Sequence, residues 1–199
     1  MGYPNENKFD AAIQSARRSF PDVPTWVIKG VIATESCFDP GAYNPETGSA
    51  TGASRGLMQM TEKTASGLGF TGSPNKLNDP ATNVYYGTKL LSQLYKGDWR
   101  DAVSAYNGGY RPQLGFGARM QRSGVRCMGR IVPIGEYCNQ KHVDRFMKHA
   151  KYFAAKEGAT LPFVAPAGMA YCLPPTVKKA APPLALILVV IGFLVFQRN

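Results

Sequence analysis

The sequence predicts an all-α domain, followed by a proline-rich linker and one C-terminal transmembrane helix. Three observations lead to this prediction. Apolar residues recur at helical spacing through much of residues 9–158, residues 159–183 hold six prolines, and residues 184–196 are thirteen apolar residues without a break. A chain of 199 residues with 44% hydrophobic residues suits one domain with appendages and excludes a wholly disordered protein.

The first two helices are expected on either side of residues 21–24. The first ends at Pro21 and the second begins at Pro24, because proline fits the first turn of a helix but interrupts its interior. Each carries an apolar stripe, formed by Phe9, Ala12, Ile13, Ala16 and Phe20 in the first and by Val27, Ile28, Val31 and Ile32 in the second.

Capping residues mark the starts of three further helices. Thr61 is expected to begin a short helix, Asp79 with Pro80 a long one, and Asp98 a third. Their expected ends lie at Gly67, at Gly97 and at residues 107–109.

Residues 111–135 are rich in Gly and Arg and are expected to form a long loop. Asn139 then starts the clearest helix, which Gly158 closes. Its apolar stripe lies opposite a basic face of Lys141, Arg145, Lys148 and Lys151. The predicted domain therefore covers residues 1–158.

The C-terminal part of the sequence predicts a tether and a membrane anchor. Residues 159–183 are expected to form an extended linker. As a helix, the seventeen uncharged residues 180–196 would span ~25 Å, slightly less than the ~30 Å hydrocarbon core of a bilayer. A buried core helix is the alternative, but the segment is apolar on all sides and the chain has little protein to surround it. We therefore expect residues 184–196 to anchor the chain in a membrane.

The formal charge of +10 lies entirely in the second part of the sequence. Residues 1–110 hold ten basic and ten acidic residues, whereas residues 111–199 hold thirteen and three. Five arginines in the Gly-rich loop suit phosphate contacts, so nucleic-acid binding is one hypothesis. Few aromatic residues lie between them, and no recognised binding motif is present. We therefore favour anionic cell-wall polymers or lipid headgroups over nucleic acid as partners.

Four cysteines, Cys37, Cys127, Cys138 and Cys172, allow three full pairings. Cys127 and Cys138 flank ten residues that a disulfide could close as a hairpin. Cys138 with His142 and His149 could instead bind a metal, but the spacing lacks a CxxC pair. The N-terminal residues show no secretory signal, so we favour unpaired thiols, and we expect neither a metal nor another cofactor.

Glu35 is the side chain with the clearest potential for catalysis. It follows Ile28, Val31 and Ile32 at helical spacing, so its carboxyl is expected on the apolar face of its helix. Apolar surroundings disfavour the charged carboxylate and raise the pKa, which keeps a proton available near neutral pH. A general acid that cleaves a glycosidic bond needs this property. The alternative is a solvated helix end that pairs with a nearby lysine.

Three motifs occur in order around this glutamate. Glu35-Ser36 is followed by Gly-Leu-Met-Gln at residues 56–59 and by Ala-Tyr-Asn-Gly-Gly at residues 105–109. Over residues 26–109 the sequence strongly resembles the lytic transglycosylase family with the lysozyme-like fold, the SLT-type and goose-type group. The resemblance implies that Glu35 is the single catalytic acid and base. It also implies a glycan-binding set of Ser36, Asn44, Met58, Gln59, Tyr106 and Asn107.

Two features depart from the family pattern. Many members have a serine nine residues after the glutamate, where this chain has Asn44, which could still bond to an acetamido group. Residues 45–51 look like an insertion. For the other positions a structural role is the alternative: core packing for Met58, a helix end for Asn107, and backbone bonding for Ser36 and Gln59.

The resemblance implies cleavage of the β-1,4 bond between N-acetylmuramic acid and N-acetylglucosamine in peptidoglycan, with closure of a 1,6-anhydro ring. A hydrolytic lysozyme is the nearest alternative and would need a second carboxylate, nominally Asp39 or Glu46. An inactive structural or nucleic-acid-binding membrane protein is a third. Because the chain combines this domain with a membrane anchor and no export signal, we expect it on the internal membrane of a bacteriophage particle. There it would open the host wall locally during genome entry or lysis, beside other virion membrane proteins. The bacterial inner membrane is the alternative location.

Overall fold

The computed structural model describes residues 2–45 and 52–164 of the chain. The predicted anchor at 184–196, and all of the predicted linker beyond residue 164, lie outside these residues. Within the described part the fold is mostly helical, as predicted. None of its helices is both long enough and apolar enough to cross a bilayer.

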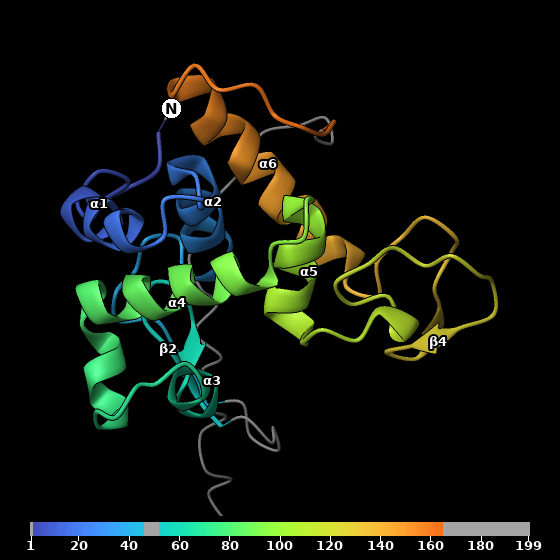
Figure 1. The fold of residues 1–199 in the computed structure, drawn as a ribbon, viewed down its shortest axis with the longest axis horizontal. Coiled ribbons are helices and arrows are strands. Elements are labelled where there is room, and N and C mark those ends of the chain that lie inside the picture. Colours follow the sequence, from blue (N-terminus) through green and yellow to red (C-terminus); the bar gives the residue numbers. More distant parts are fainter. Residues whose placement is uncertain (1, 46–51, 165–199) are drawn as a thin grey trace, which may run out of the picture.

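Helix α2 (Thr25–Glu35) lies at the centre of the domain, and its residues 26–34 are all buried. Helix α6 (Gln140–Lys156) packs along it, as Figure 1 shows. The two helices approach closely at Gly30, where a Cβ atom would lie 3.0 Å from the ring of Phe146. The absence of a side chain at Gly30 therefore allows the close contact that sets how the two helices face each other.

Helices α1 (Asp10–Ser19) and α4 (Pro80–Leu94) pack against each other beside α2 (Figure 1). The predicted caps are confirmed for three helices. Thr61 accepts a backbone N–H bond at the start of α3 (Glu62–Gly67), Asp79 does so at the start of α4, and Asp98 at the start of α5 (Trp99–Gly108). These bonds satisfy N–H groups that a helix start otherwise leaves unpaired.

The end predicted for the fourth helix at Gly97 is wrong, because α4 ends at Leu94. The next residue, Tyr95, has an extended backbone, and its ring stacks on Trp99 with the ring centroids 4.0 Å apart. This stacking ties the connection after α4 to the start of α5.

The prediction of a purely α-helical domain needs correction, because the described residues include two small antiparallel sheets. Strands β1 (Tyr43–Asn44), β2 (Ser54–Arg55) and β3 (Met60–Thr61) form a small antiparallel sheet beside α3. Two-residue strands are too short to show the alternating pattern by which a strand is predicted. Two short 3-10 helices, η1 (Pro74–Asn78) and η2 (Pro112–Leu114), also occur.

Residues 109–138 form a projecting hairpin lobe, seen beside the label β4 in Figure 1. Strands β4 (Arg126–Cys127) and β5 (Arg130–Ile131) pair within it. The expectation of unpaired thiols is wrong here, because Cys127 and Cys138 form a disulfide with their Cα atoms 5.8 Å apart. Among the described cysteines none is free. The lobe has its own small core, made by Phe116, Met120, Cys127, Val132 and Cys138.

Candidate active site

Glu35 is the last residue of α2, and its side chain is 15% exposed. The three apolar residues expected to precede it on the same face, Ile28, Val31 and Ile32, are all buried. A carboxyl group therefore stands at the end of a buried helix, where little of it meets solvent. The low exposure fits the predicted position of Glu35 on the buried face of its helix.

The backbone turns sharply just after Glu35. Cys37 and Phe38 have φ angles of 52° and 63°, in the left-handed region that residues with a Cβ atom rarely adopt. Phe38 is fully buried and packs against the rings of Tyr3 and Phe153. Its burial holds the turn in this unfavourable conformation, and such local strain is typical of functional sites.

Ser36 connects the end of α2 to the motif at residues 56–59. Its buried hydroxyl lies within hydrogen-bond distance of two backbone carbonyl oxygens, at 2.7 Å from that of Leu57 and 3.1 Å from that of Ile32. The contacts observed for Ser36 are therefore structural ones. Because Ser36 directly follows Glu35, they fix the backbone at the end of α2.

The turn at residues 56–59 is held by a buried asparagine that the sequence did not reveal. Asn83 of α4 accepts the backbone N–H of Met58 at 2.7 Å and donates to the carbonyls of Arg55 and Leu77. Gly56 has a φ angle of 72°, and a Cβ atom there would lie 2.6 Å from the Asn83 amide nitrogen. Only glycine suits this position, since a side chain would displace the amide.

Met58 and Gln59, both predicted to line the glycan groove, contact the protein itself. Met58 is fully buried, and a Cβ atom at Gly87 would lie 2.4 Å from its sulfur. Gln59 has a φ angle of 47° and its amide is bonded within the turn and sheet, to Ala42, Ser54 and Gly56. Both residues shape the turn opposite the end of α2, and their contact with a glycan stays a prediction.

Tyr106 of α5 contacts the turn at residues 56–59 as well. Its hydroxyl donates a hydrogen bond of 2.7 Å to the backbone carbonyl of Met58. Burial, and after it the nearby charge of Glu35, raises the pKa of Tyr106 well above the usual value for a tyrosine. The charge of Glu35 therefore acts on Tyr106, and the contact of Tyr106 with a glycan stays a prediction.

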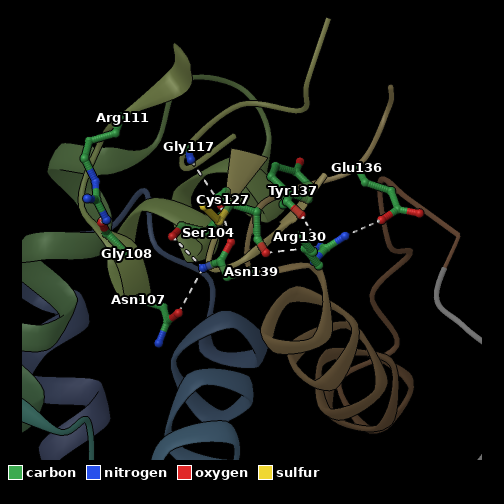
Figure 2. Close-up of a disulfide and its surroundings, with 11 residues drawn as sticks. Ser104, Asn107, Gly108, Arg111, Gly117, Cys127, Arg130, Glu136, Tyr137 and Asn139 are labelled. Carbon is green, nitrogen blue, oxygen red and sulfur yellow. Dashed lines mark hydrogen bonds and ion pairs between the residues drawn. A yellow bond between two sulfur atoms is a disulfide. The ribbon is translucent and has the colours of Figure 1, made fainter. Parts of the chain in front are cut away.

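Asn107, the next residue, takes part in fixing the start of α6. The side-chain amide of Asn139 donates to the Asn107 side chain at 3.0 Å and to the Ser104 carbonyl at 2.9 Å. The Ser104 hydroxyl donates back to Asn139 at 2.8 Å, and Figure 2 shows this cluster beside the disulfide. Asn139 was expected to start the last helix. It does precede α6, but its side chain binds α5 and does not cap its own helix.

His142 is a neighbour of Glu35 that sequence reasoning did not place at the site. Its Nε2 atom lies 3.6 Å from Glu35 Oε1, and its side chain is 14% exposed. Burial, and after it the charge of Arg145, lowers the pKa of His142 to about 4, so the imidazole is neutral at neutral pH. The sequence suggests His142 only as a metal ligand. No group of three or more metal-binding side chains occurs in residues 2–45 and 52–164.

Asn44 and Asp39 lie on exposed segments. Asn44 pairs with Ser54 in the small sheet, and its role toward a glycan stays a prediction. Asp39 accepts the backbone N–H of Gly41 at 2.8 Å, which is the turn-forming contact of an aspartate in a loop. Glu46, the other nominal second carboxylate, lies outside the described residues.

Several arginines of the hairpin lobe bind the protein itself. Arg111 stacks over the Phe116 ring and donates to the Gly108 carbonyl, Arg119 pairs with Asp98, and Arg130 pairs with Glu136 (Figure 2). Arg122 and Arg126 are exposed. The arginines that motivated the nucleic-acid hypothesis thus serve in part to hold the lobe together.

Comparison with known proteins identifies the family. The transglycosylase SLT domain model matches residues 13–118, more than half of the chain. Among solved structures, an inactive mutant of lytic transglycosylase Slt from Pseudomonas aeruginosa is 20% identical, with a TM-score of 0.57, over 80% of this chain and 26% of its own. The 70 kDa soluble lytic transglycosylase SLT70 from Escherichia coli is 26% identical, with a TM-score of 0.48, over 76% and 25%.

The chain thus spans about a quarter of the length of either structure. The likeness to the Pseudomonas protein shows a shared fold. No curated protein matches the sequence. The matched residues include Glu35 and the motifs at 56–59 and 105–109, which the structure brings together at the end of α2. The chain belongs to the transglycosylase SLT domain family.

Proposed function

We propose that this protein is a peptidoglycan lytic transglycosylase in which Glu35 is the only acid and base. The observation that carries the proposal is the position of Glu35, a carboxyl 15% exposed at the end of a buried helix, with Tyr106 and the neutral His142 beside it. Such a site can hold a proton for a leaving group and take one back afterwards. Membership of the SLT domain family supports the substrate.

In the first step, protonated Glu35 gives its proton to the oxygen that bridges N-acetylmuramic acid and N-acetylglucosamine, and the bond between this oxygen and the muramic C1 breaks. Positive charge develops on the muramic ring, and the acetamido oxygen of the substrate itself can stabilise it. In the second step, Glu35 takes the proton from the muramic C6 hydroxyl, whose oxygen bonds to C1 and closes the anhydro ring. The enzyme ends as it began, and no water is consumed.

A hydrolytic lysozyme would require a carboxylate that activates water. Asp39, one of the two nominal residues for that role, is exposed and bonded within its own turn. The two reactions differ in their products, since hydrolysis leaves reducing ends on the muramic residues and transglycosylation leaves anhydro ends.

The test is to digest purified peptidoglycan with the protein and analyse the fragments by mass spectrometry. We expect anhydro-muropeptides from the unaltered chain and none from Glu35→Gln. The matched control is Glu62→Gln, the same change at an exposed glutamate in α3, which should leave the products unchanged. Fragments with reducing ends would support the hydrolase. A folded protein that yields no fragments would support an inactive structural role.

We also propose that residues 184–196 hold this domain at a membrane, in a bacteriophage particle that opens the host wall during genome entry or lysis. The support is the unbroken apolar sequence of this segment beside a domain of the SLT family. Flotation with lipid vesicles tests the anchor: the full chain should float, and a chain ending at residue 164 should not. Equal flotation of the two chains would refute the proposal that residues 184–196 form a membrane anchor.

A further inference from the structure

His142 and Glu35 face each other because α2 and α6 run in opposite directions where they pack. At Gly30 the backbone of α2 lies against Phe146, and five residues later along α2 the carboxyl of Glu35 lies 3.6 Å from His142, four residues earlier along α6. The contact therefore follows from the register of two packed helices and not from a mobile loop.

The start of α6 is itself fixed to the motif on α5. Asn139 precedes α6 and is bonded through its side chain to Ser104 and Asn107 (Figure 2). His142 lies in the first turn of α6, and its backbone N–H donates to the Asn139 carbonyl at 2.8 Å. A chain of contacts thus leads from Asn107 through Asn139 to His142, and it positions the imidazole beside Glu35.

The neutral imidazole of His142 suits its neighbour Glu35, which as a general acid has to hold a proton and then release it. Among the described residues, Glu35 from α2 lies beside His142 and the charge of Arg145 from its own helix acts on it, while the charge of Glu35 also acts on Tyr106 of α5. A cationic side chain in this place would hold Glu35 ionised and so oppose its role as an acid. A neutral imidazole has one N–H donor and one acceptor nitrogen, and it can bond to the carboxyl without adding charge.

We propose that His142 is a positioning residue, whose imidazole bonds to the carboxyl of Glu35 and orients it toward the glycosidic oxygen. The inference rests on the function proposed above and adds a residue that lies outside residues 13–118, the segment that matches the family model. The separation of 3.6 Å shortens to a hydrogen bond when glycan fills the site, as is common when an active site binds its substrate. The N–H of His142 then donates to the carboxylate that forms after proton transfer.

Two substitutions of His142 distinguish a role in positioning Glu35 from a role in packing. His142→Leu fills a similar space and removes the hydrogen bond, whereas the amide of His142→Gln can still donate. We expect His142→Leu to lower kcat for anhydro-muropeptide release about 10- to 100-fold with little change in KM. We also expect it to move the basic limb of the pH profile of kcat/KM to higher pH, because the ionised acid loses a stabilising donor. His142→Gln should retain most of kcat and the original basic limb.

The matched control is His149→Gln, the same change in the same helix. His149 is also buried, but its partner is the hydroxyl of Tyr3 at 2.7 Å. This variant should lose stability without moving the basic limb. If His142→Leu does not fold, His142→Met takes its place, because it also fills the space without a hydrogen-bond donor.

Unchanged kcat in His142→Leu would overturn the inference, and so would equal losses in the Leu and Gln variants with an unmoved basic limb. A His142→Gln variant as inactive as Glu35→Gln would do the same. These results concern His142 alone as long as the unaltered chain releases anhydro ends. If it releases none, the proposed function fails instead.

Discussion

The hydroxyl of Tyr106 donates a hydrogen bond to the backbone carbonyl of Met58, with 2.7 Å between the two oxygen atoms. Since Ser36 bonds to the carbonyl of the adjacent Leu57, the turn at residues 56–59 is held from α5 on one side and from the end of α2 on the other. Residues expected to touch the glycan therefore also fix one another, and through this arrangement they fix Glu35.

Removing the Tyr106 hydroxyl should weaken this arrangement. We expect Tyr106→Phe to lower the free energy of unfolding by about 1 kcal/mol, because the Met58 carbonyl loses its donor. The rate of peptidoglycan cleavage should fall further than the decrease in the folded fraction of the protein would cause. Urea unfolding and initial rates measure the two effects. Tyr110→Phe, at a tyrosine that is 61% exposed, is the control and should match the unaltered chain. A fully active Tyr106→Phe would refute this role.

The contact between α4 and the turn predicts different effects for two Gly→Ala changes. Gly87→Ala should destabilise the domain by ~1–3 kcal/mol, because its Cβ atom would lie 2.4 Å from the buried sulfur of Met58. Gly67→Ala, at the end of α3, meets no atom within 4 Å and should be neutral or slightly stabilising. Thermal unfolding of both variants checks the difference. Equal stability of the two would show that Met58 is not tightly packed against α4.

The two histidines of α6 predict loss of stability in mild acid. Burial, and after it Arg145, lowers the pKa of both His142 and His149 from 6.5 to about 4. Above pH ~6.5 both are neutral in the folded and unfolded chains, and their full contribution is present. Between pH ~6.5 and ~4 only the unfolded chain takes up these protons, so the free energy of unfolding falls, on the order of 3 kcal/mol for each histidine. Below pH ~4 they add no further loss.

Urea unfolding at several pH values between 7 and 4 measures this effect. The variant with both His142→Gln and His149→Gln should depend less on pH across the same window. A free energy of unfolding that stays level, or rises, as the pH of the unaltered chain falls from 6.5 to 4.5 would contradict the burial of neutral histidines.

The disulfide should protect the hairpin lobe against proteolysis. Replacing Cys127 and Cys138 together by Ser removes a cross-link worth ~3 kcal/mol for a loop of this length, and the lobe should open. Trypsin should then cut faster at the exposed Arg122 and Arg126. Met128→Asn, at the exposed hairpin tip, keeps the disulfide and should stay resistant. Equal digestion of the two variants would show that the cross-link does not stabilise the lobe.

Much of the helical framework could be predicted from the sequence because its signals are local. The caps at Thr61, Asp79 and Asp98 each depend on a side chain and a backbone N–H two or three residues away. The apolar stripe before Glu35 is local in the same sense. These helices begin as predicted, although α4 ends earlier than expected, and they include the helix that carries Glu35.

The features that were missed depend on contacts between distant residues. Asn83 holds the turn at 56–59 from another helix, and His142 meets Glu35 through the register of α2 and α6. The spacing of Cys127 and Cys138 offers a hairpin disulfide as one alternative, but four cysteines in a sequence do not specify which pairing forms. Neither residue spacing nor composition reveals the contacts of Asn83 and His142.

The central claim is that Glu35 gives a proton to the bridging oxygen and takes one back from the muramic C6 hydroxyl, and that no water is consumed. Digestion of peptidoglycan in water labelled with heavy oxygen tests this claim directly. We predict that the unaltered chain releases muropeptides that are lighter than hydrolysis products by one water molecule and carry no heavy oxygen, and that Glu35→Gln releases none. Heavy oxygen at the new muramic ends, or the same products from Glu35→Gln, would contradict the claim.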